Sequence, residues 1–360
     1  MISLAEITRY ARVALKYGVV AAGVLTLLFL LFLLIRFLIN VINPPVPEPP
    51  GMKFGPMVNN LPVQTTKPTH TYNINTITGL LPVVPDRLRV YKVKQPESDL
   101  LALQKAREVV RTHGYTLEET LVSPGEYRWK NSTGGSIIYD IQSKNFQLVT
   151  GIGLEKQDFV LPSEDNITSQ LLTYIQDFGS SLIGLDQQTP LLEYYQSDGT
   201  NLLPVVDRTT AYLAKVTFKQ NDLPVDPFIF KTDESRTVES LPLYYTQPDG
   251  TNQTFIVKAG GRNIQIVSGT FKNYQIDTAD FSTYPLKTPE QAFEDLKNGD
   301  AYFVNPGTTN TISITEVVLG YFMPETTPEY VMPIYIFKGK DFTAYVYGIG
   351  TYVPDQNLSN

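Results

Sequence analysis

The sequence predicts an α+β protein, with an N-terminal transmembrane helix followed by antiparallel-sheet modules that are each backed by a short helix. Three observations predict this class: one long apolar run near the start, three later segments with the apolar spacing of helices, and strand-like segments joined by Gly- and Asn-rich turns. The expected parts are a cytoplasmic tail (1–16), a transmembrane anchor (17–38), a proline-rich spacer and extended arm (39–85), a first αβ module (86–160), a helix with a repeated hairpin section (161–283) and a second αβ module (284–353).

The apolar run Tyr17–Ile35 holds nineteen residues and no charged side chain. At 1.5 Å per residue, a helix of this length spans about 28 Å, close to the hydrocarbon thickness of a bilayer. Three basic residues precede the run, and only Arg36 lies between it and Lys53, so the amino end is expected in the cytoplasm. We therefore expect an uncleaved single-pass anchor in the cell membrane, with the bulk of the chain extracytoplasmic.

Small residues recur every four positions along the predicted anchor, at Ala14, Gly18, Ala22 and Thr26. They share one helix face, and small residues on one face allow two membrane helices to approach closely. The pattern predicts a membrane-helix contact face. The alternative is that small residues are simply common in membrane helices.

The composition limits the partners of the exported part. Of the 29 basic and 36 acidic side chains, four and two lie in the first fifty residues, which leaves 25 and 34 and a net charge of −9 for the rest. Nucleic acid is therefore not an expected partner. The chain has no cysteine, so it has no disulfide and no thiolate metal site, which fits a bacterial cell envelope.

Five prolines between positions 44 and 50 favour polyproline II, a stiff spacer that rises about 3.1 Å per residue. From Gly51 to about Pro85 the chain is rich in Pro, Thr and Asn without a helical period, which predicts an extended arm. A strand is expected near Leu88–Val93.

The first αβ module opens with a helix that is expected to start at Ser98, a favourable N-cap, and to end at Gly114. The strands expected after it are Thr116–Val122, Tyr127–Lys130, Ser136–Ile141 and Phe146–Gly151. A second helix is expected from Ser163 to Gly179.

The middle section contains an internal echo. Leu192–Asn201 resembles Leu241–Asn252, and Thr217–Lys219 resembles Thr270–Lys272. Each longer copy contains Asp-Gly, which favours a tight hairpin with positive φ at both central positions. Neither copy has the ligand spacing of a calcium loop.

The second αβ module opens at Thr288, where a threonine cap, a proline and Gln291 predict a capped helix. The strands expected after it are Thr311–Phe322, Tyr330–Phe337 and Phe342–Ile349. The module repeats the helix and three strands of the first one, or else shares only its hydrophobic pattern.

No catalytic motif is present, and the two histidines fit structural positions. We therefore expect no enzyme, no cofactor and no metal site. The alternative is a carboxylate-dependent wall hydrolase that uses two acidic residues on strands, with Glu118, Glu119, Glu193 and Glu316 as candidates. Paired aromatic residues suggest a second alternative, a surface for wall glycan or peptide at Tyr194, Tyr195, Tyr244 and Tyr245, although strands also favour such residues in a core.

Several segments of the second module resemble the carboxy-terminal module of the YycH/YycI family; they are Tyr284–Leu286, Thr288–Leu296, Ile314–Tyr321 and Tyr330–Phe337. The resemblance implies a single-pass extracytoplasmic protein that regulates a membrane sensor kinase. The usual Asn-Ala-x-x-Gly ending is replaced here by Val346–Gly350. The spacer, Gly79–Pro82 and Tyr127–Trp129 also look like uncharacterised single-pass proteins of ultra-small bacteria.

The sequence thus predicts a non-enzymatic, membrane-anchored extracytoplasmic protein that binds or regulates a protein partner in the membrane or cell envelope. It leaves open whether the chain forms a homo-oligomer.

Overall fold

The computed structural model describes residues 24–35, 51–64, 68–225, 238–246 and 252–351. The chain divides into two compact units, Met1–Pro49 and Pro50–Asn360. In the first unit, residues 24–35 form a helix whose side chains are all exposed. Of the helices in these described ranges, none has both the length and the apolar character needed to cross a membrane. Residues 17–23 and 36–38 of the expected anchor at 17–38 lie outside the described ranges.

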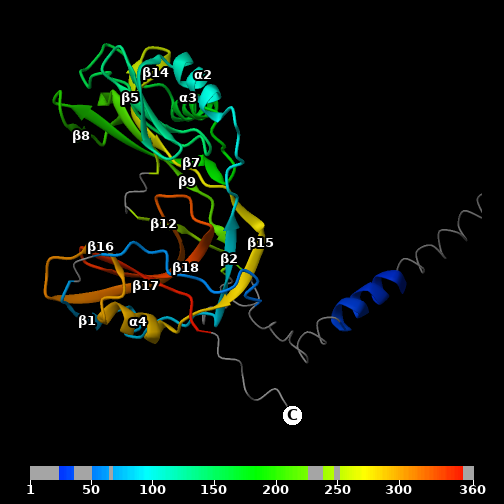
Figure 1. Ribbon diagram of the computed structural model, residues 1–360. Helices are drawn as coiled ribbons and strands as arrows, with labels where there is room; N and C mark the ends of the chain where they lie inside the picture. The colour runs from blue at the N-terminus through cyan, green and yellow to red at the C-terminus, as the bar shows by residue number, and fades with distance from the viewer. Residues whose placement is uncertain (1–23, 36–50, 65–67, 226–237, 247–251, 352–360) are drawn as a thin grey trace, which may run out of the picture. The chain divides into compact units, whose positions relative to one another are not determined.

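The second unit is a mixed α+β structure dominated by antiparallel sheets, with three α-helices in its described part (Figure 1). Its large sheet has nine strands, all antiparallel, in the order β3-β4-β5-β6-β14-β13-β9-β7-β8. The strands of the large sheet are β3 (Tyr115–Ser123), β4 (Glu126–Asn131), β5 (Ser136–Asp140), β6 (Phe146–Val149), β7 (Leu185–Ser197), β8 (Leu202–Pro204), β9 (Leu213–Gln220), β13 (Gln253–Gly260) and β14 (Asn263–Phe271).

Two helices cover one face of the large sheet, α2 (Ala102–Thr112) and α3 (Glu164–Asp177), which Figure 1 shows next to each other. Their apolar stripes and the sheet residues beneath them form one buried cluster, which includes Val110, Leu171, Val216 and Phe255. The helices form because their apolar residues recur at helical spacing and meet this face. The opposite face is covered at one end by Ile152 and Leu154, which pack with strand residues there.

The small sheet has eight strands and a central path β1-β17-β18-β19-β16. On it β2 pairs with β18 and β15, while β1 and β12 both pair parallel to β17. The strands of the small sheet are β1 (Thr71–Ile74), β2 (Arg87–Val93), β12 (Leu243–Tyr245), β15 (Ile276–Pro285), β16 (Tyr302–Pro306), β17 (Thr311–Met323), β18 (Tyr330–Gly339) and β19 (Phe342–Tyr347). Helix α4 (Pro289–Lys297) buries Ala292 and Leu296 against one face. A two-stranded ladder joins β10 (Leu223–Pro224) to β11 (Ser240–Leu241).

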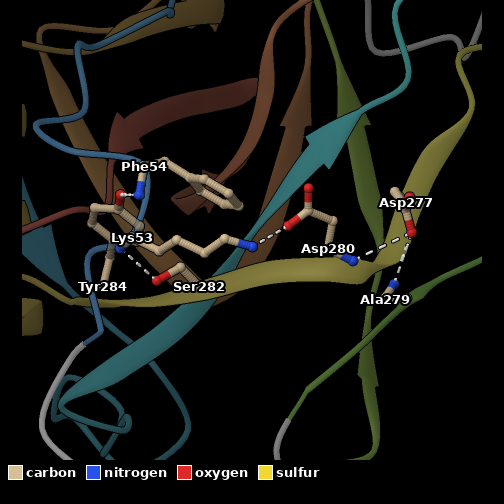
Figure 2. Close-up of polar contacts among 7 residues, drawn as sticks. All are labelled: Lys53, Phe54, Asp277, Ala279, Asp280, Ser282 and Tyr284. Atoms are coloured by element: carbon tan, nitrogen blue, oxygen red, sulfur yellow. Dashed lines mark hydrogen bonds and ion pairs between the residues drawn. The ribbon is translucent and has the colours of Figure 1, made fainter.

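The arm after the proline-rich segment is held against the small sheet. Met52, Phe54, Met57 and Leu61 pack with the buried residues of the face opposite α4. Figure 2 shows the polar contacts of the first arm residues with β15. Lys53 forms an ion pair of 2.6 Å with Asp280, and the backbone N–H of Lys53 donates to Ser282 Oγ at 2.9 Å. The described arm is therefore part of the folded unit, and it adds β1 to the sheet.

The predicted helix starts were right for two helices and wrong for one. Ser163 is the N-cap residue of α3, and Thr288 caps α4 with a full capping box. The expected start at Ser98 is wrong, because α2 begins at Ala102 and its N-cap residue, Leu101, has no side-chain cap. Asp99 turns the chain instead, since its carboxylate accepts from the backbone N–H of Leu101 at 2.9 Å.

The two copies of the internal echo differ in structure. In the first copy Asp198 and Gly199 join β7 to β8, but only Gly199 has positive φ. The Asp198 carboxylate closes this turn by accepting from the backbone N–H groups of Thr200 and Asn201. The second Asp-Gly lies outside the described residues, and the described strands on either side of it, β12 and β13, belong to different sheets and do not pair with each other. The shorter echo is adjacent in space, because Thr217 and Thr270 both pair with Thr254.

Candidate ligand-binding cavity

A cavity of about 700 Å³ lies between the large sheet and β12. Volumes of this size are typical of small-molecule sites. Its lining comes from β7, β9, the residues around β12, and β19, which are far apart in the sequence. The lining residues are Leu191, Glu193, Lys215, Thr217, Phe218, Lys219, Gln220, Asp222, Pro242, Leu243, Tyr244, Tyr245 and Tyr345.

One wall of the cavity is polar and comes from alternate residues of β9. Successive side chains of a strand point to opposite faces. Val216 and Phe218 therefore belong to the buried cluster under the helices, and Lys215, Thr217 and Lys219 form the polar part of the cavity lining, which Phe218 also reaches. Lys215 forms an ion pair of 3.3 Å with Glu193 of β7. Two acidic and two basic side chains line the cavity, so its charges balance.

The opposite wall is aromatic. The Tyr244 ring lies where a side chain at Gly320 would be, since a Cβ there would be 2.4 Å from Tyr244 Cε2. Tyr345 meets this ring edge-on, with ring centroids 5.8 Å apart. The backbone N–H of Tyr321 donates to the carbonyl of Pro242 at 2.9 Å, which holds the segment against β17. Close packing against β17 and β19 thus sets the position of Tyr244.

Gln220 is fixed at the end of the polar wall by three hydrogen bonds. Its Nε2 donates to Asn273 Oδ1 at 2.8 Å and to the carbonyl of Tyr274 at 2.9 Å. Its Oε1 accepts from the Tyr245 hydroxyl at 3.2 Å. Buried amides with every partner in place hold one geometry. This corner of the cavity is therefore preorganised.

Burial raises the pKa of two kinds of group in the cavity. It raises the pKa of the Asp222 carboxyl, and the nearby Lys219 opposes that rise. Burial also raises the pKa of the Tyr244 and Tyr245 hydroxyls. Both tyrosines therefore stay protonated at neutral pH. The cavity offers hydroxyl and ammonium donors, carboxylate acceptors and an aromatic surface.

The structure brings two of the four candidate tyrosines to the cavity, Tyr244 and Tyr245. Tyr194 and Tyr195 are neighbours on β7 and point to opposite faces of the large sheet. Tyr194 donates to the Glu164 carboxylate of α3, and burial followed by this contact raises its pKa to about 12. Tyr195 packs in the cluster that contains Ile152. Ala14, Gly18 and Ala22 of the expected contact face lie outside the described residues, and Thr26 lies in the helix at 24–35.

Each of the four carboxylates considered for hydrolysis has a basic partner. The pairs are Glu118 with Lys130 at 2.5 Å, Glu119 with Arg107 at 2.7 Å, Glu193 with Lys215 at 3.3 Å and Glu316 with Lys338 at 2.9 Å. Within the described ranges, no group of three or more His, Asp or Glu side chains is placed to hold a metal ion.

Sequence reasoning missed most of the cavity, namely Lys215, Lys219, Gln220, Asp222 and Tyr345. One signal was present, because the polar residues of Lys215–Lys219 alternate with apolar ones, which marks one open face of a strand. Nothing local indicates that β12 lies opposite that face.

Comparison with known proteins gives only distant structural similarity. No protein-family model matches the chain. No curated protein matches it either. Among solved structures, an uncharacterized protein from Eubacterium rectale is similar, at 13% identity over 79% of this chain and 91% of that chain, with a TM-score of 0.36. The C-terminal domain of Bacillus megaterium YpeB is similar at 10% identity over 72% of this chain and 100% of that chain, with a TM-score of 0.22.

Proposed function

We propose that this chain is a non-enzymatic, membrane-anchored extracytoplasmic protein that binds or regulates a partner in the membrane or cell envelope. The uncharged run at 17–35 and the prolines that follow it support the anchor. The observation that carries the binding role is the cavity, in which a fixed aromatic wall faces a charge-balanced polar wall. Such a combination is typical of binding sites.

The resemblance of several segments between positions 284 and 337 to the YycH/YycI family supports a regulatory form of this proposal. In that form the anchor carries the domain beside a membrane sensor protein, and the small residues Ala14, Gly18, Ala22 and Thr26 contact its membrane helix. Replacing Gly18 and Ala22 by Leu is expected to weaken crosslinking of the full chain to one dominant membrane protein. Unchanged crosslinking would remove this helix face from the proposal.

The topology has a direct test because the chain contains no cysteine. Single cysteines are introduced by Ser3→Cys in the expected tail and by Val206→Cys, which is fully exposed. A membrane-impermeant maleimide applied to intact cells should label the cysteine at 206 and leave the one at 3 unlabelled until the cells are lysed. Labelling only at position 3 would reverse the proposed orientation.

A second candidate function is binding of cell-wall glycan or peptide, and the cavity favours it specifically. Aromatic rings beside hydroxyl, ammonium and carboxylate groups suit a polar ligand of balanced charge. Full-length protein in detergent should sediment with purified wall material, and Lys219→Ala with Tyr244→Leu should reduce the bound fraction. Lys130→Ala on β4 is the matched control, because Lys130 lies outside the cavity. Turnover of the wall polymer that one Glu→Gln or Asp→Asn change abolishes would favour the wall hydrolase instead.

A further inference from the structure

The connection between β1 and β2 exposes three large apolar side chains. In this segment, residues 75–86, Ile77 is fully exposed, and Leu80 and Val83 are 71% and 67% exposed. Single exposed apolar residues are ordinary on protein surfaces, whereas three of them within seven residues of one connection stand out. We refer to residues 75–86 as the apolar loop.

The apolar loop is held in a defined shape. The backbone N–H of Gly79 donates to the Thr76 carbonyl at 3.0 Å, which closes a turn that ends at Gly79 with positive φ. The Thr76 hydroxyl donates to the carbonyl of Leu80 at 2.7 Å. Leu81 and Val84 pack against the core of the small sheet. The loop therefore buries some of its apolar residues and presents Ile77, Leu80 and Val83 to solvent.

The apolar loop ends next to the place where the arm enters the fold. Its last residue, Asp86, accepts from the backbone N–H of Leu286 at 2.8 Å. Gly51 donates from its backbone N–H to Thr283 Oγ1 at 3.0 Å, three residues earlier in the chain than Leu286. In Figure 2 the residues after Gly51 lie along the same strand, β15, where Lys53 meets Asp280. The chain thus joins the small sheet close to the base of the loop.

Chain length keeps this region within reach of the expected bilayer. Fifteen residues, 36–50, separate the end of the helix at 24–35 from Gly51. Even fully extended, they span no more than about 50 Å. The apolar loop carries no charge before Asp86. An uncharged loop with exposed apolar side chains near the tether, residues 36–50, is suited to the lipid interface and has no basic group to attract an anionic headgroup.

We propose that the apolar loop inserts Ile77, Leu80 and Val83 into the interfacial layer of the bilayer that holds the anchor. This inference rests on the proposed anchor. Three side chains bind a membrane weakly by themselves, but the tether makes the contact intramolecular, so a weak contact suffices. Insertion gives the domain a second attachment besides the anchor, and it limits how the domain turns relative to the membrane.

The test uses the full chain reconstituted into phosphatidylcholine vesicles. An environment-sensitive dye is attached to a single cysteine, introduced by Ile77→Cys, by Leu80→Cys or, as the matched control, by Val206→Cys. Part of the lipid is replaced by brominated lipid, which quenches the dye. Val206 is fully exposed like Ile77 but lies beyond β8 of the large sheet. We expect the brominated lipid to quench the dye at 77 and 80 and to leave the dye at 206 unchanged. Quenching at 80 should fall when Ile77→Ser and Val83→Ser are added.

The outcomes distinguish failure of the loop proposal from failure of the proposed anchor. Protein that floats with the vesicles but shows no quenching at 77 or 80 would overturn the loop proposal and leave the anchor standing. A blue-shifted dye without quenching would also overturn it, because the loop would then be covered by protein. Failure of the full chain to float with the vesicles would overturn the proposed anchor, and the loop proposal with it.

Discussion

Trp129 is the only tryptophan in the chain, and it reports on one carboxylate. It is buried in the large sheet, and its indole N–H donates to Glu119 Oε2 at 3.0 Å. The Arg107 guanidinium holds the same carboxylate with two hydrogen bonds of 2.7 Å. Arg107 first, and then Trp129, lower the pKa of Glu119.

A pH titration of Trp129 fluorescence should therefore report the protonation of Glu119. Because the folded-state pKa of Glu119 is lowered, the stability it contributes is present above the unfolded value, about 4.3, and is lost as the pH falls through the folded value. The fluorescence should stay constant from neutral pH to about 4.3 and change only below it. Glu119→Gln should remove this transition. A transition of equal size in that variant would assign it to another group.

Gly320 leaves room for the Tyr244 ring, so a side chain at this position should lower the stability of the fold. A Cβ at this position would meet Tyr244 Cε2 at 2.4 Å, so Gly320→Ala has to displace the ring. Overpacking of this kind costs about 1–3 kcal/mol. Urea unfolding should show this cost as a lower free energy of unfolding for Gly320→Ala. Gly51→Ala, whose Cβ would lie 3.2 Å from Ser282 Oγ, should lose less. Equal losses would mean that Tyr244 is not held by Gly320.

At the scale of elements, local sequence signals predicted the helices and most strands. Apolar spacing placed α3 and α4, and the continuous apolar run Tyr330–Phe337 placed β18. Pairing partners were beyond such signals. Leu243–Tyr245 reads as one half of a hairpin, yet it pairs parallel with β17, about eighty residues later in the sequence. Local pattern decides that a segment is a strand, and tertiary packing decides which neighbour it finds.

The helix caps give a prediction at this scale. Thr288 accepts from the backbone N–H of Gln291 at 3.2 Å, and the Gln291 side chain accepts from the backbone N–H of Thr288 at 2.9 Å. Ser163 is in the same place on α3, but its side chain makes no cap hydrogen bond. Thr288→Ala should lower the free energy of unfolding by about 1 kcal/mol, and Ser163→Ala should lower it by less. Denaturant unfolding of both variants measures this difference, and equal losses would contradict it.

At the scale of the whole molecule, the arm joins residues about 230 positions apart in the sequence. The Tyr284 hydroxyl accepts from the backbone N–H of Phe54 at 3.0 Å and donates to the Gly55 carbonyl at 2.9 Å. The Phe54 ring also stacks on Tyr330, with centroids 4.8 Å apart. The sequence indicated only an extended segment here, since an arm without periodicity carries no mark of the surface it packs on.

Removing one hydroxyl tests whether the arm is held in this way. Tyr284→Phe eliminates both hydrogen bonds and should weaken arm docking by about 1–2 kcal/mol. Amide hydrogen exchange at Phe54 should become faster. Tyr302→Phe removes a single hydroxyl contact, to the carbonyl of Thr246, and is the control. Unchanged exchange at Phe54 in Tyr284→Phe would mean that the apolar contacts hold the arm without this hydroxyl.

The cavity is a property of the whole molecule as well, which limits how much of it the sequence could predict. The sequence marks Tyr244 and Tyr245 as an aromatic pair. Lys219, Asp222 and Tyr345 become neighbours of that pair only when the two sheets are in place. The sequence therefore predicted the aromatic wall of the cavity through Tyr244 and Tyr245. It did not predict the polar wall that gives the cavity its charged groups.

Photo-crosslinking from the cavity in intact membranes tests most directly whether an envelope partner binds there. A photoreactive amino acid replaces Leu191, a half-exposed residue in the cavity lining, and in a control chain it replaces Leu203 of β8, which is similarly exposed and lies outside the lining. We expect one dominant envelope adduct from position 191, reduced by Lys219→Ala and absent from position 203. The same adducts from both positions, or none from 191, would contradict binding at the cavity.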